Sequence, residues 1–484
     1  MNENLSKPNN NLAFKAGALY LIAEFITRGI SFLATPAFSR LLPSAVFADS
    51  KIFESWTYLL APIISLSLYQ SMARAKFDYN EKFASYLSST LSLIAVLTTI
   101  VLFAGIFLRN LAVRLLGFSA PLLLLMILYS FAYNGLQCVQ LYERQLMHYK
   151  SNIILTMVSV IPGVVFSVLS VWKYASSASE MLLLNIRIIS FFLPTTVIGF
   201  IVIIIAWAKG RVFYNPEQWQ YGIRYSVPMM ATTISSQIFF QSAIVIVRYV
   251  SGSDAAAVVA IAMTVGYIMD ILVHAVDNAW RPWLYEQINE KKYSNVREMW
   301  TALIIGVSTL VWCFTMVAPE LVMILGGATF KDATLLISPI LCGSLANFLL
   351  IEYTALEQYY KKTRISGYAS ILSSIINIAL NFLLVNLFGY QAVVYATAFA
   401  YIIACFIHFS MIRSFEKNDL MRTTFSFFVI AGCFVLCMIS MASFALSLAF
   451  RLLIILIVLT CVSFAMRKKL KAMINVFIKK NSNK

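Results

Sequence analysis

The stretch "MLLLNIRIISFFLPTTVIGFIVIIIAW", residues 181–207, contains a single charged side chain, that of Arg187. An α-helix of these residues rises about 40 Å at 1.5 Å per residue, and the hydrocarbon core of a bilayer is about 30 Å thick. The stretch therefore predicts a helix that crosses a membrane.

Similar apolar stretches run from one end of the chain to the other. Of its 484 residues, 60% are hydrophobic and 12% are charged, whereas about a quarter of the residues in a soluble protein are charged. We predict fourteen spans, at residues 12–37, 52–71, 85–108, 120–142, 152–172, 181–207, 221–250, 255–280, 299–319, 333–355, 367–388, 390–412, 424–442 and 446–466. The predicted fold class is an all-α integral membrane protein, with loops too short to hold a soluble catalytic domain.

The net charge of +16 follows the predicted topology. With the N-terminus inside, 27 of the 37 Lys and Arg residues lie in inner loops and tails, 8 lie in outer loops, and Arg28 and Arg187 lie within spans. An inner excess of this size is typical of the positive-inside rule, so we expect a multi-pass protein with both termini in the cytoplasm. Because the positive charge is explained by topology, no nucleic-acid partner is expected.

Several kinds of chemistry are not expected. The seven cysteines all fall within predicted spans without a paired spacing, so neither a disulfide framework nor a metal site is predicted. No glycine-rich phosphate loop of an ATPase is present in the sequence. The longest outer loop, residues 320–332, is too short for a membrane polymerase. We therefore predict no catalytic residues, no cofactor and no enzymatic activity.

The order of the spans predicts two lobes. Spans one to six and seven to twelve each make six crossings, so the two halves share one orientation, and two parallel six-helix lobes around a central site are a known transporter plan. We predict an N-terminal lobe over residues 1–210, a C-terminal lobe over residues 211–415, and two accessory spans with a basic tail over residues 416–484.

Two spans carry ionisable residues on one helical face. Glu24 and Arg28 in span one are four residues apart, and either neutralise each other or face a wet cavity in which Arg28 meets an anionic headgroup. Asp270, His274 and Asp277 in span eight also form one stripe. Because charges inside a membrane are costly, these residues are candidates for coupling to protons or sodium ions, although a polar seam between helices is the alternative.

Further polar residues within or near spans complete the candidate sites. The substrate-binding candidates are Arg28, Arg187, Arg248, Gln237, Gln241 and Asn377, and the ion-coupling candidates are Glu24, Asp270, His274 and Asp277. The gating candidates are Glu54, Arg74, Arg281 and Glu352. Arg74 and Arg281 lie 207 residues apart, at the inner ends of spans two and eight. Arg248 can instead snorkel to the interface, Glu54 and Glu352 can be ordinary interfacial charges, and Asn377 can join helices.

Two stretches resemble a known family. The segments "TPAFSRLLPSAVFAD", residues 35–49, and "NAWRPWLYE", residues 278–286, resemble corresponding segments of polysaccharide-biosynthesis flippases in the multidrug/oligosaccharidyl-lipid/polysaccharide exporter superfamily. This resemblance covers nearly the whole chain. It implies two six-helix lobes around a central cavity, with two accessory helices.

The resemblance also implies a function. Such a flippase moves undecaprenyl-pyrophosphate-linked oligosaccharide from the inner to the outer leaflet of the bacterial plasma (inner) membrane by alternating access, for O-antigen or capsule assembly. It implies a lipid-linked oligosaccharide substrate, a possible H⁺ or Na⁺ coupling ion, and a polysaccharide polymerase and chain-length regulator as partners. The alternatives are a drug or organic-cation antiporter of the same superfamily, a lipid II flippase and a membrane oligosaccharide polymerase.

Overall fold

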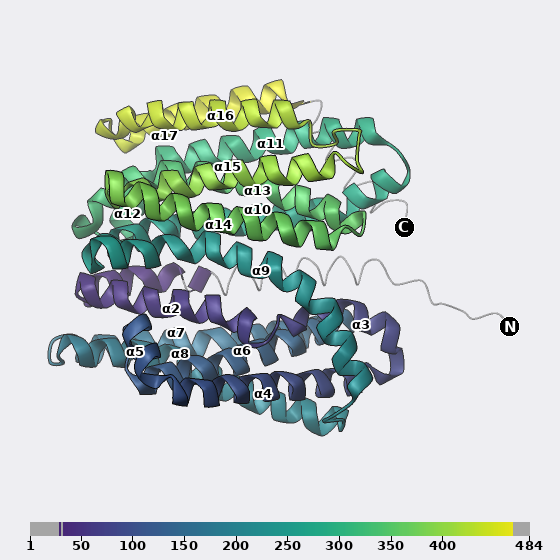
Figure 1. Cartoon of the computed structure of the whole chain (residues 1–484). Helices are drawn as coiled ribbons and strands as arrows, with labels where there is room; N and C mark the ends of the chain where they lie inside the picture. Colours follow the sequence, from purple (N-terminus) through teal and green to yellow (C-terminus); the bar gives the residue numbers. More distant parts are fainter. Residues whose placement is uncertain (1–28, 31, 468–484) are drawn as a thin grey trace. The chain divides into compact units, whose positions relative to one another are not determined.

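The computed structural model describes residues 29, 30 and 32–467, and every regular element among them is helical (Figure 1). Twelve of the described helical segments are long and apolar enough to cross a membrane. These twelve correspond to predicted spans three to fourteen. The all-α membrane fold is therefore confirmed, while the count of fourteen stays a prediction. Most of span one lies outside the described residues, and the helix of span two, Ser44–Ile64, is not among the twelve.

The chain divides into two compact units, Met1–Gln237 and Ile238–Lys484. The helices of unit 1 are α2 Ser44–Ile64, α3 Met72–Tyr79, α4 Phe83–Phe107, α5 Arg109–Leu116, α6 Ala120–Gln145, α7 Tyr149–Tyr174 and α8 Glu180–Gly210, followed by the first part of α9 Pro216–Ser251. Since α9 runs through the boundary between the units, the predicted lobe limits stay a prediction.

Unit 2 contains the rest of α9 and eight further helices. They are α10 Ser253–Asn289, α11 Tyr293–Met316, α12 Ala318–Leu325, α13 Thr334–Tyr359, α14 Thr363–Phe388, α15 Ala392–Ile412, α16 Thr423–Ser440 and α17 Leu448–Ala465. Short 3₁₀ turns lie at Leu68–Ser71 and Asn80–Lys82 in unit 1, and at Ala328–Ala333 and Met441–Ala445 in unit 2. The predicted break between the last two spans, near Ser443, is confirmed because it falls in the last of these turns.

The second predicted span, residues 52–71, has the wrong limits. Its helix, α2, begins at Ser44 and ends at Ile64. Pro62 removes one backbone donor from the last turn of this helix. Leu66 and Ser67 then both have φ of 51°, in the left-handed region, so the chain cannot continue as one helix to residue 71.

Unit 1 is built on the close packing of α6, α7 and α8. A Cβ atom added at Gly199 on α8 would lie 2.6 Å from the Cβ of Ala132 on α6, so only glycine allows these two helices to approach so closely. This packing fixes the position of α8, and α8 carries Arg187.

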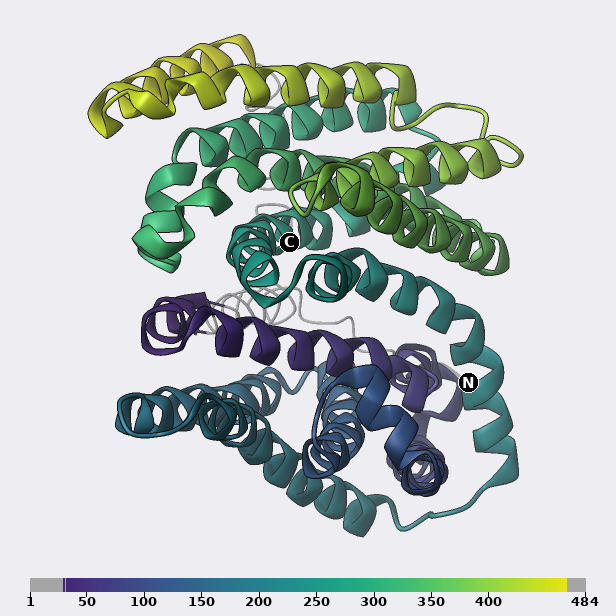
Figure 2. The ribbon, with the colours of Figure 1, turned by 60° about the vertical axis from the view of Figure 1, so that its left-hand side comes forward.

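Unit 2 is organised around α13, which packs against α10, α11, α15 and α16. Along it, the side chains of Phe348, Leu349 and Tyr353 are fully or almost fully buried. By contrast, only 6% of the apolar window of α17 is buried. In Figure 2, α17 (yellow) lies with α16 at the edge of the unit. An exposed helix that is apolar on all sides is suited to lipid, so α17 faces the bilayer.

Candidate functional site

Unit 1 contains an ion-pair network on α2, α7 and α8, in which Arg187 and Ser167 are buried and Lys51 and Glu54 are partly exposed. The guanidinium of Arg187 donates from Nη2 to Oε1 of Glu54 over 2.8 Å and from Nη1 to Oγ of Ser167 over 3.2 Å. The ammonium of Lys51 lies 2.7 Å from the other carboxylate oxygen of Glu54. The structure thus brings together a predicted substrate-binding residue and a predicted gating residue, with Lys51 as a second cation.

Aromatic rings fix the orientation of Arg187. Its guanidinium lies 3.9 Å from the ring centroid of Phe38 and 4.6 Å from that of Phe191. Arg187 is 2% exposed, and Nε has no hydrogen-bond partner among the described residues. Because a buried guanidinium with an unused donor can donate to a further acceptor, an anion that reaches this network meets a preformed positive site.

Unit 2 contains a cluster with an excess of negative charge near the C-terminal end of α10. Arg281 donates from Nε and Nη2 to the two carboxylate oxygens of Asp277 over 2.9 and 2.7 Å, which makes a bidentate pair. The indole of Trp280 donates to Oε2 of Glu352 on α13 over 2.8 Å. The predicted gating residues Arg281 and Glu352 therefore lie beside Asp277, a predicted ion-coupling residue.

Glu352 is the least satisfied carboxylate of this cluster. It has no exposed surface, and Oε1 has no hydrogen-bond partner among the described residues. An ionised carboxylate with one hydrogen bond is costly in such surroundings unless a proton or another cation binds to it. Glu352 therefore belongs with the ion-coupling candidates as well as with the gating ones.

The predicted trio on α10 divides into two sites. Nε2 of His274 lies 3.6 Å from Oδ2 of Asp270, and Asn347 on α13 donates to Oδ1 of Asp270 over 3.4 Å. Asp277 instead pairs with Arg281, about 10 Å further along the helix at 1.5 Å per residue. Residues that share one helical face can thus serve two separate groups.

A narrow cavity lies next to the Asp270 group. Its lining includes Phe239, Phe240, Met263, Asn347, Thr397 and Tyr401, from α9, α10, α13 and α15. The space open to the centre of a water molecule is about 20 Å³, and about 10–15 Å³ is needed for one water. Asn347 both lines the cavity and donates to Asp270, so a water molecule in the cavity can bond the residue that holds this carboxylate.

Asn377 belongs to a buried polar cluster behind the cavity lining, in which its Nδ2 has no hydrogen-bond partner among the described residues. Its Oδ1 accepts from Ser242 over 3.0 Å and from Asn381 over 3.2 Å, while Thr397 donates to Asn381 over 3.1 Å. All four side chains are buried. The cluster joins α9, α14 and α15, and this arrangement favours the interpretation of Asn377 as a helix-joining residue.

The remaining predicted residues have varied surroundings. Gln241 donates to the hydroxyl of Tyr267 over 3.1 Å. Arg74 is exposed and pairs with Asp78 over 3.1 Å. Gln237 and Arg248 are both half-buried on α9. Glu24 and Arg28 lie outside the described residues.

Two buried ion pairs were not among the predicted sites. His408 on α15 lies 2.9 Å from Glu357 on α13, and both are at most 1% exposed. Arg451 on α17 donates to the carbonyl of Met316 and to Glu320, and it is buried on a helix that is otherwise mostly exposed. A lone His or Arg inside an apolar stretch indicates that an oppositely charged side chain lies nearby. The sequence does not show which residue of another helix supplies it.

The model of one protein family, described as "Polysaccharide biosynthesis protein", matches residues 14–288. The chain belongs to this family. The match includes both segments from which the resemblance was recognised. No curated protein matches the chain.

Solved structures share the fold of this family member at low identity. An inward-facing multidrug resistance MATE family transporter of the MOP superfamily matches with a TM-score of 0.60 and 13% identity, over 85% of this chain and 98% of that chain. The MATE multidrug transporter DinF-BH matches with a TM-score of 0.61 and 13% identity, over 87% of this chain and 99% of that chain. The lipid II flippase MurJ, in an inward closed conformation, matches with a TM-score of 0.59 and 15% identity, over 94% of this chain and 100% of that chain. These similarities show a transporter fold.

Proposed function

We propose that this protein is a flippase that moves undecaprenyl-pyrophosphate-linked oligosaccharide repeat units from the inner to the outer leaflet during assembly of a surface polysaccharide. The family match over residues 14–288 carries the proposal, because the family is one of polysaccharide biosynthesis. The fold shared with the lipid II flippase MurJ supports it. In this setting the protein lies in the bacterial inner membrane, where a polymerase and a chain-length regulator act on its product.

Such a substrate needs a polar path through the bilayer. Each sugar hydroxyl or phosphate oxygen left without a partner in hydrocarbon costs several kcal/mol. In unit 1, Lys51 and Arg187 together exceed the charge of Glu54 by one positive charge. We assign this network to the pyrophosphate, with Glu54 as the counter-ion that holds both cations in the unloaded state and releases them when the phosphate arrives.

Unit 2 supplies the groups for ion coupling. Asp277 and Glu352 have one nearby guanidinium, that of Arg281, between them. Asp270 lies beside His274 and the water-sized cavity. A proton or Na⁺ bound at either carboxylate group would change the local charge, and that change is what biases a two-state transporter.

The fold does not separate this function from drug export, because the MATE transporters and MurJ match with similar TM-scores. The deciding experiment compares three substrates in proteoliposomes of purified protein: an undecaprenyl-pyrophosphate oligosaccharide, lipid II and a cationic dye. We expect flipping of the first and little transport of the other two. Faster movement of the dye would establish the antiporter alternative, and faster movement of lipid II would establish the other flippase alternative.

The proposed orientation has its own test. The inner excess of Lys and Arg supports a cytoplasmic location for both termini. Reporter fusions after Lys150, Arg297 and Lys469 should all report a cytoplasmic location. An external signal after Lys469 alone would mean that the chain has one span fewer than proposed.

A further inference from the structure

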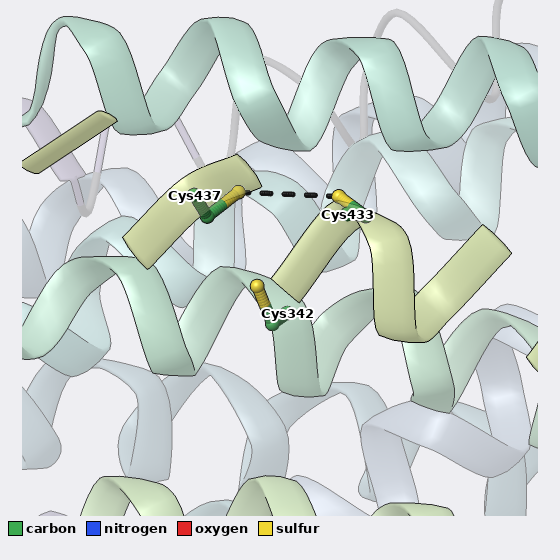
Figure 3. A group of neighbouring side chains, drawn as sticks. All are labelled: Cys342, Cys433 and Cys437. Carbon is green, nitrogen blue, oxygen red and sulfur yellow. Dashed lines mark hydrogen bonds between the residues drawn. The ribbon is translucent and has the colours of Figure 1, made fainter. Parts of the chain in front are cut away.

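Three of the seven cysteines meet inside unit 2. Cys342 lies on α13, while Cys433 and Cys437 lie one turn apart on α16, and all three are buried. Their sulfur atoms all lie within 4.8 Å of one another, and those of Cys433 and Cys437 are 3.9 Å apart. Figure 3 shows the three side chains pointing toward one common space between the two helices.

These spacings match those of a three-coordinate metal site. A metal–thiolate bond is about 2.3 Å long, so three sulfurs in a plane around one ion lie about 4.0 Å apart. Small rotations of the cysteine side chains would bring the observed sulfur–sulfur distances to this value. No fourth His, Cys, Asp or Glu joins the group among the described residues, whereas a structural zinc site needs four ligands.

The surroundings favour an ion of low charge. The site lies between apolar helices, where each uncompensated charge is costly. Every thiol that becomes a thiolate ligand releases its proton to the medium. Cu(I) bound by one thiolate and two neutral thiols carries no net charge, and its preference for soft sulfur ligands fits a set of three cysteines. The hydroxyl of Thr315, which donates to Cys437 Sγ over 3.5 Å, stabilises a thiolate at that position.

We propose that Cys342, Cys433 and Cys437 form a binding site for Cu(I). An ion there joins α13, at the centre of unit 2, to α16, at its edge. The alternative is a metal-free cluster held by sulfur hydrogen bonds, as between Cys433 and the carbonyl of Ser308 over 3.6 Å. The site is independent of the proposed transport function, and its test measures metal rather than flipping.

The test uses the purified full-length protein in detergent, without oxygen and with a phosphine reductant. Cu(I) is titrated in competition with bicinchoninate, and its coordination is measured by X-ray absorption. We expect about one tightly bound ion per chain, with sulfur neighbours at about 2.3 Å. Cys342→Ser, Cys433→Ser and Cys437→Ser should each weaken binding more than tenfold.

Two other cysteines provide matched controls. Cys405 is buried and contacts the carbonyl of Ala346, and Cys461 is exposed. Cys405→Ser and Cys461→Ser should bind Cu(I) as the unaltered protein does. The proposal is overturned if either control loses binding as strongly as the cluster variants, or if the triple Cys342/Cys433/Cys437→Ser variant binds as tightly as the unaltered chain. Fewer than two sulfur neighbours around copper in the unaltered protein would overturn it without any variant.

Discussion

Each unit contains a cluster of charged side chains, and the two clusters have net charges of opposite sign. In unit 1, the carboxylate of Glu54 lies within 2.8 Å of both Lys51 and Arg187, so two cations share one anion. In unit 2, the guanidinium of Arg281 pairs with Asp277, and the nearby carboxylate of Glu352 has a hydrogen bond from Trp280 but no cation paired with it among the described residues. A site with excess positive charge suits an anionic substrate, and a site with excess negative charge suits a cation. The difference supports our proposal that unit 1 binds the substrate and unit 2 binds the coupling ion.

The two clusters also differ in how completely they are satisfied. Both oxygens of Glu54 are bonded in unit 1, whereas Oε1 of Glu352 has no partner among the described residues of unit 2. An anion that reaches unit 1 finds only Nε of Arg187 free among the described residues until it displaces Glu54, while the unsatisfied carboxylate of unit 2 gains from a proton or a cation at once. The comparison therefore predicts that mutations in unit 1 affect stability more than mutations in unit 2.

The largest effect should come from Arg187→Ala. This substitution leaves the largely buried Glu54, whose side chain is 13% exposed, with one cation and removes the stacking on Phe38 and Phe191. Removal of one partner from a buried pair typically costs about 3–5 kcal/mol, so thermal unfolding in detergent should occur at a much lower temperature and flipping should cease.

Arg187→Lys separates stability from substrate binding. A lysine keeps the positive charge but cannot donate to Glu54 and Ser167 from one planar group. We expect a folded protein whose apparent affinity for the pyrophosphate-linked substrate falls more than tenfold. If the lysine variant folds and flips as the unaltered chain does, the network is structural and the phosphate binds elsewhere.

Glu352→Gln should have the next largest effect, on ion coupling. The amide oxygen of Gln can still accept from Trp280, but the side chain can no longer take up a proton. We expect stability within about 1 kcal/mol of the unaltered value. Flipping in liposomes should lose its acceleration by an imposed proton or sodium gradient.

Glu357→Gln is the matched control, because Glu357 is an equally buried carboxylate on the same helix that pairs with His408. It should lower stability and leave the gradient dependence in place. If the two Gln variants lose gradient dependence alike, the effect belongs to any buried carboxylate on α13 and not to the cluster around Arg281.

The sequence alone predicts most of the fold and only half of each cluster. Spans three to fourteen follow from hydropathy, because each is a long apolar run with few charges. The end of α2 at Ile64 is not visible to hydropathy, since residues 65–71 carry no charge and the break lies in the positive φ of Leu66 and Ser67. Local backbone conformation, which hydropathy does not report, decides that boundary.

The site residues show the same limit. Glu54 and Arg187 are each conspicuous as charges in predicted spans, yet their pairing depends on how α2 packs on α8. Asp277 and Arg281 are four residues apart on one helix, so their ion pair can be predicted from the sequence. The meeting of Cys342 with Cys433 and Cys437 was not, because it joins helices about ninety residues apart.

A smaller effect is expected from Asp270→Asn. The amide oxygen can still accept from Asn347, but the negative charge beside His274 is lost. If Asp270 contributes to coupling, the variant should bind substrate normally and flip it several-fold more slowly under an ion gradient. Flipping at the unaltered rate with the same gradient dependence would show that Asp270 is only a polar contact between α10 and α13.

The smallest effect should come from Arg74→Gln. Asp78 accepts from Arg74 over 3.1 Å and from the hydroxyl of Tyr221 on α9 over 2.7 Å, so this exposed group ties α3 to α9 within unit 1. Exposed ion pairs contribute little to stability, and we expect no measurable change in thermal unfolding. A gating role would still slow flipping modestly, and Tyr221→Phe should slow it in the same way because it loosens the same tie. Arg211→Gln, at another exposed arginine of unit 1, is the control, and an equal slowing there would mean that the effect reflects the loss of surface charge.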